Sequence, residues 1–117
     1  NVAVGRTALL NNTTASENTA VGYQSLYSNT TGIENIAFGS GALYSNTTAN
    51  NNTAVGRRAL YLNTTGSEVT ALGHQALYSN TTGQYNTAVG KNALGSNTSG
   101  TGNNAPPPTT QQLGIRL

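Results

Sequence analysis

The chain has 117 residues, of which only 7% are charged, far below the quarter that is typical of a globular domain. It contains no Cys, which excludes disulfides and thiolate metal sites, and no apolar run reaches the roughly 20 residues of a membrane-spanning helix. The net charge of +2 comes from five Lys or Arg and three Asp or Glu, too few charges to indicate a nucleic-acid-binding surface.

A 17-residue repeat organises the chain from its first residue, with the consensus N-T-A-V-G-x-x-A-L-Y-S-N-T-T-G-x-x. Ala at position three, Gly at five, Leu at nine, Asn at twelve and Thr at thirteen do not vary. Stacked coils place equivalent residues above one another about 4.8 Å apart, so a repeat without insertions is what stacking predicts. The six units are 1–17, 18–34, 35–51, 52–68, 69–85 and 86–102.

Within each unit the pattern predicts two short strands, at positions two to four and eight to ten, because clusters of Asn, Thr and Gly disfavour a helix. Gly at five and usually at fifteen would form the corners, where a positive φ is needed. Neighbouring apolar residues point to opposite faces of a strand. One face would fill the coil, and the other would be covered by another copy of the chain. We therefore expect an all-β parallel β-solenoid, a β-roll of six 17-residue coils, assembled as a homotrimer.

Residues 103–117 begin a seventh repeat and then depart from it. Asn103 to Ala105 are in phase, but Pro106 stands where Val belongs, and proline has no N–H with which to continue a ladder. We interpret 106–112 as an exit linker, followed by the alternating apolar pattern of a short strand that leads into a further domain or caps a neighbouring chain. Asn1 opens a repeat without a cap, so we expect the array to continue upstream.

The N-x-A-V-G stretches at 1–5, 18–22 and 52–56, and their counterparts, resemble the head repeats of trimeric autotransporter adhesins. The A-L-Y-S-N-T-T-G half of the repeat resembles the Asn/Thr-rich repeats of phage tail-fibre proteins. The resemblance covers residues 1–102 and implies a left-handed parallel β-roll in which three chains pack around one axis. It also implies that these residues are structural and not catalytic.

Two columns of identical residues are predicted to be structural ladders. We expect the Asn amides to hydrogen-bond from coil to coil. The alternative is glycosylation, since each Asn opens an N-T-T or N-T-S sequon, but glycans on every coil would crowd one another. The ladders are Asn12, Asn29, Asn46, Asn63, Asn80 and Asn97, and Leu9, Leu26, Leu43, Leu60, Leu77 and Leu94.

The Thr column at position thirteen, Thr13 to Thr98, is interpreted as a solvated β face, with ice binding as the functional alternative. The stacked tyrosines, flanked at position ten by Leu10 and Gly95, would cover a coil edge or an interchain seam, or offer a platform for sugar rings. They are Tyr27, Tyr44, Tyr61 and Tyr78.

Basic residues at positions six and seven of the fourth to sixth repeats would form a local edge that is either solvated or in contact with anionic polysaccharide or phosphate. They are Arg57, Arg58, His74 and Lys91. His74 has no ligand partner, so we expect no metal site. Glu17 and Glu34 repeat at the spacing of a glycosidase pair but without a cleft. We expect no enzyme activity and no cofactor.

We thus expect a structural segment of an extracellular fibre, an adhesin at the cell surface or a phage tail fibre, that spaces and displays a receptor-binding tip. The alternatives are a solenoid binding module for ice or carbohydrate, and the subunit of a self-assembling surface filament. The expected partners are further copies of the chain and a cell-surface polysaccharide or receptor, with no nucleic acid and no membrane insertion.

Overall fold

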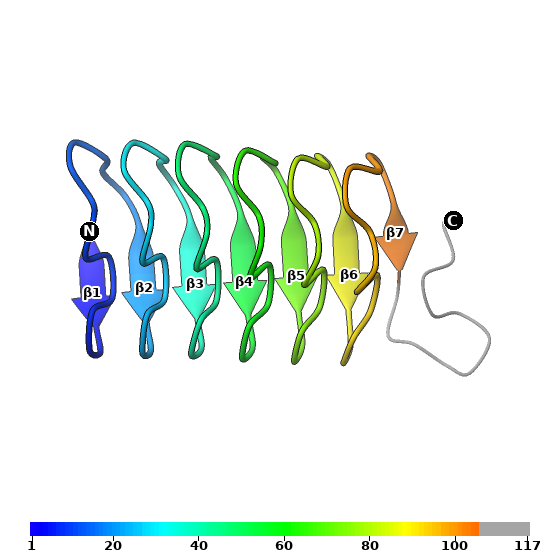
Figure 1. The fold of residues 1–117 in the computed structure, drawn as a ribbon, viewed down its shortest axis with the longest axis horizontal. Coiled ribbons are helices and arrows are strands. Elements are labelled where there is room, and N and C mark those ends of the chain that lie inside the picture. Colours follow the sequence, from blue (N-terminus) through cyan, green and yellow to red (C-terminus); the bar gives the residue numbers. More distant parts are fainter. Residues whose placement is uncertain (106–117) are drawn as a thin grey trace.

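The computed structural model describes residues 1–105, which form one parallel sheet with its strands in chain order (Figure 1). Each strand pairs with the next at an offset of one repeat, as Val2 with Thr19 and Thr87 with Asn104. The strands are β1 (Val2–Val4), β2 (Thr19–Val21), β3 (Ile36–Phe38), β4 (Thr53–Val55), β5 (Thr70–Leu72), β6 (Thr87–Val89) and β7 (Asn104–Ala105).

In Figure 1 the arrows all point the same way, and the rest of each repeat loops out and back over the sheet. The predicted all-β parallel β-solenoid is confirmed, and no helix occurs between residues 1 and 105. The predicted linker at 106–112 and the strand pattern of Leu113, Ile115 and Leu117 lie outside the described residues.

The second predicted strand, at positions eight to ten, is wrong, because these residues form turns. The invariant Leu at position nine has a left-handed backbone, with φ between 48° and 53°. Its N–H still donates to the next repeat, as from Leu26 to the carbonyl of Ala42 at 3.0 Å. The left-handed residues at positions seven and nine turn the chain, but their backbone N–H and C=O groups still point along the solenoid axis. The hydrogen bonds between repeats therefore continue here without an extended strand.

The corner at position five is confirmed, since Gly there has φ between 120° and 137°. A Cβ on Gly56 would lie 2.5 Å from the carbonyl oxygen of Gly73 in the next repeat, so this corner requires Gly. The corner predicted at position fifteen is wrong, because the positive φ falls at seventeen, as in Glu34 at 57°. Position fifteen holds only Gly or Ala because it packs on the Asn column: a Cβ on Gly66 would lie 2.6 Å from Oδ1 of Asn63.

The coil interior is narrow and has an apolar and an amide part. The apolar part joins Ala at position three to the residues at eight and nine, and its largest side chains are Leu26, Leu43, Leu60 and Leu77, all fully buried. The side chains at positions two and four of each repeat, at the two ends of the strand, point away from this core. Their side chains are half-buried or exposed within the single chain, with 56% of Val4 and 55% of Phe38 exposed.

Candidate functional site

The Asn column at position twelve is a continuous hydrogen-bonded ladder. Nδ2 of Asn46 donates to Oδ1 of Asn29 at 2.9 Å and to the carbonyl of Ala49 in its own repeat at 3.1 Å. The same pair of bonds recurs at Asn29, Asn63, Asn80 and Asn97. Asn29, Asn46, Asn63 and Asn80 are fully buried. The nitrogen that a glycan would modify therefore has both hydrogens engaged and lies inside the folded coil at these four sequons.

A second amide column, which sequence reasoning did not identify, runs through position one. Nδ2 of Asn18 donates to the carbonyl of Gly32 at 2.8 Å, and its Oδ1 accepts the backbone N–H of Asn35 at 2.9 Å. The signal was present in the sequence, since Asn opens five of the six repeats and is also residue 103. Val69 interrupts the column, so the N–H of Asn86 lacks the side-chain acceptor that its counterparts have.

The two amide columns are joined to each other and satisfied. Nδ2 of Asn52 reaches Oδ1 of Asn46 at 3.4 Å, and Nδ2 of Asn86 reaches Oδ1 of Asn80 at 3.3 Å. Within residues 1–105 every buried side-chain nitrogen or oxygen has a hydrogen-bond partner. A polar network with all members paired fixes the register of neighbouring coils.

The Thr column at position thirteen uses its hydroxyl hydrogens within the protein. Oγ1 of Thr64 donates to the carbonyl of Thr81 at 3.1 Å, beside the backbone N–H bond between the same residues at 3.0 Å. The equivalent hydroxyl bonds elsewhere in the column measure 3.0 to 3.4 Å. In these five repeats the hydroxyl hydrogen is bonded within the ladder and does not donate to surface water.

The tyrosines at position ten form an aromatic ladder with nearly parallel rings. The ring centroids of Tyr27, Tyr44, Tyr61 and Tyr78 lie 5.1, 5.0 and 5.3 Å apart in order, and the interplanar angles are 5°, 11° and 2°. This spacing follows the strand separation of about 4.8 Å. Leu10 takes the same position before Tyr27, and Gly95 takes it after Tyr78.

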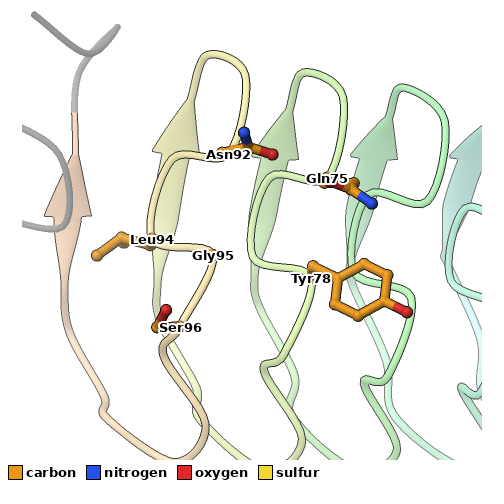
Figure 2. Close-up of a pocket in the computed structure, with 6 residues that line it drawn as sticks. All are labelled: Gln75, Tyr78, Asn92, Leu94, Gly95 and Ser96. Carbon is orange, nitrogen blue, oxygen red and sulfur yellow. The ribbon is translucent and has the colours of Figure 1, made fainter.

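A pocket of about 620 Å³ lies at this end of the ladder, where Gly95 has no side chain. Figure 2 shows its lining, which comes from neighbouring repeats near β5 and β6. The lining residues are Gln75, Tyr78, Asn92, Leu94, Gly95 and Ser96.

The basic residues lie at the same turn, positions six and seven, of successive repeats. Arg57, His74 and Lys91 occupy position six of successive repeats, linked by backbone bonds such as that from Gln75 N–H to the Arg57 carbonyl at 3.0 Å. The Arg58 guanidinium lies 5.5 Å from the Tyr61 ring centroid, within the range of a cation–π contact. Of the predicted basic edge, Arg58 therefore contacts the tyrosine ladder.

The predicted carboxylate pair lies apart from this surface. Glu17 and Glu34 are exposed at a corner, and neither lines the pocket. Within residues 1–105 no group of three His, Cys, Asp or Glu side chains lies close enough to hold a metal ion.

Comparisons with protein-family models, with curated proteins and with solved structures found no match. The part of the chain that the structure describes contains no helix of the length and apolarity needed to cross a membrane.

Proposed function

We propose that the chain is a structural segment of an extracellular fibre, in which copies of the solenoid pack through the outward face of the sheet. The observation that carries this proposal is the character of that face. Positions two and four of the six repeats hold only Val, Thr, Ile, Phe and Leu, without a charge. Val4, Phe38 and Val55 are 56%, 55% and 39% exposed. Apart from Thr at position two of four repeats the strip is apolar, and an uncharged, largely apolar strip of this kind is typical of an interaction surface.

Another copy of the chain is the occupant that suits the strip best. The strip repeats at the spacing of the strands, and a second copy offers the same side chains at the same spacing. A partner without this period would contact the side chains of only a few repeats. Packing around a common axis would bury the strips of three chains together, which supports the homotrimer implied by the resemblance to adhesin heads.

The mechanical role follows from the hydrogen bonds along the solenoid axis. Each repeat is joined to the next through the strand, through the turn at position nine and through the amide columns, as in the bonds from Leu60 N–H to Ala76 and from Asn80 to Asn63. A rod held by such continuous ladders resists bending. It can therefore hold a receptor-binding tip at a fixed distance from a cell surface or a virion.

Light scattering on the purified chain, with two charge-introducing variants, tests this proposal. Val55→Asp places a charge on the outward strip, and we expect it to give a folded monomer where the unchanged chain gives a trimer. Leu60→Asp places a charge in the fully buried core, so it should unfold the coil itself. Arg57→Asp, at an exposed corner, should change neither property. A folded monomer for the unchanged chain at micromolar concentration would contradict the proposal.

Ice binding is a second candidate function. One observation favours the outward face of the sheet, and not the Thr column at position thirteen, as the ice-binding surface. Thr19, Thr53, Thr70 and Thr87 recur at position two, each two residues before a Val or Leu on the same outward face. Thermal hysteresis and shaped ice crystals in a solution of the purified protein would favour this function. Their absence at high protein concentration would remove it.

A further inference from the structure

The tyrosine ladder ends beside the pocket at Gly95, which is lined by Tyr78. Tyr78 stacks one face of its ring on Tyr61 with a centroid distance of 5.3 Å and an interplanar angle of 2°. In the following repeat, position ten is Gly95, which has no side chain to cover Tyr78. Tyr78 and Gly95 both line the pocket, so position ten of the sixth repeat leaves open the place that a further ring of the column would take (Figure 2).

The walls of the gap combine one aromatic ring with neutral polar side chains. Gln75 and Asn92 occupy position seven of adjacent repeats, and Ser96 follows Gly95. Two amides and a hydroxyl supply both donors and acceptors and carry no charge. Asn92 and Ser96 are exposed and Gln75 is half-buried, so a molecule that enters from solvent can reach all three.

This combination indicates the class of ligand. A pyranose ring has an apolar C–H face that can lie on an aromatic ring and a rim of hydroxyls that need hydrogen-bond partners. A purely aromatic ligand would fill the stack but would desolvate the amides and the hydroxyl without replacing their hydrogen bonds. An anionic ligand would find no cation among the lining residues.

We infer that this pocket binds one neutral pyranose residue of a glycan, stacked on Tyr78 and hydrogen-bonded by Gln75, Asn92 and Ser96. The site belongs to a single chain and so goes beyond the structural role, because it does not depend on how copies assemble. A single ring of about 12 heavy atoms binds with a Kd on the order of 1 mM.

Filling the gap is the most direct test. Gly95→Tyr supplies the missing ring, and the fold should accept it, since Tyr occupies position ten in four other repeats. Gly95→Ser is the matched control, because it adds a side chain at the same backbone position but leaves most of the gap open. NMR spectra of the full chain, titrated with methyl β-glucoside, methyl β-galactoside and methyl α-mannoside, report binding through the signals of Gln75 and Asn92.

We expect at least one glycoside to shift these signals in the unchanged chain and in Gly95→Ser, and none to shift them in Gly95→Tyr. If Gly95→Tyr does not fold, Tyr78→Leu replaces it: Leu occurs at this position as Leu10, and loss of the stack should weaken binding about fivefold. Tyr27→Leu, at the other end of the ladder, should leave binding unchanged.

Three results would overturn the inference. The first is the absence of shifts with all three glycosides at concentrations far above the expected Kd. The second is binding that persists unchanged in Gly95→Tyr, which would place the sugar elsewhere. The third is binding of N-acetyltyrosinamide but of no glycoside, which would show that the gap accepts an aromatic ring and not a sugar.

Discussion

Replacing Asn63 by Ala tests whether the buried amide ladder holds neighbouring coils together. Nδ2 of Asn63 donates to Oδ1 of Asn46 at 3.1 Å and to the Gly66 carbonyl at 2.9 Å, and its Oδ1 accepts from Asn80 at 2.8 Å. Asn63 is fully buried, so water cannot take over these bonds. The substitution removes all three and leaves one N–H of the Asn80 amide without its partner.

The expected cost is large for one side chain. Three hydrogen bonds contribute about 1 kcal/mol each, and a buried donor left unpaired costs a further ~1–3 kcal/mol. We therefore expect Asn63→Ala to lower the free energy of unfolding by about 4–6 kcal/mol. This is comparable to the whole stability of many small domains, about 5–15 kcal/mol.

Asn97→Ala provides the matched control. Asn97 donates to Asn80 at 2.8 Å and to the Gly100 carbonyl at 3.1 Å, and it accepts from Asn103 at 3.2 Å, but it is only half-buried. Because water can replace these partners, we expect a loss of about 1 kcal/mol. Urea denaturation followed by circular dichroism measures both variants. Equal losses, or a loss below about 1 kcal/mol for Asn63→Ala, would refute the reasoning.

Three further substitutions test other parts of the fold. Gly56→Ala should destabilise the coil by more than about 2 kcal/mol, because it combines a φ of 131° with a clash against the next repeat, whereas Gly95→Ala should have little effect in the same denaturation assay. Val69→Asn restores the interrupted amide column, and we expect it to stabilise the chain by about 1 kcal/mol. Two new hydrogen bonds and one satisfied buried N–H should outweigh the lost burial of Val. A lower urea midpoint for this variant would contradict the prediction. Expressed in a host that glycosylates, the folded chain should carry no glycan on Asn63, so intact mass should show no glycan that Thr65→Ala, which removes the sequon, abolishes.

The strict period was sufficient to predict the architecture and several of its columns. A repeat of constant length places Ala20 beside Ala37 and Tyr44 beside Tyr61, whatever path the chain takes within each coil. The residue pattern within each unit predicted the strand at positions two to four, but the same reasoning gave the wrong strand at positions eight to ten. Gly at position five was also readable, because an invariant Gly after an apolar pair favours a corner with positive φ.

The path within each coil was decided only by tertiary structure. Leu rarely adopts a positive φ by itself, so no local rule predicts 53° at Leu60. The conformation is stabilised by bonds to the next repeat, such as that from Leu60 N–H to the Ala76 carbonyl, and by full burial of the side chain. The role of the Asn at position one depends equally on neighbours, since its amide partners lie 14 and 17 residues away, as for Asn18. The period of the sequence determined which residues share a column, whereas hydrogen bonds between coils decided the backbone conformation and the direction in which each side chain points.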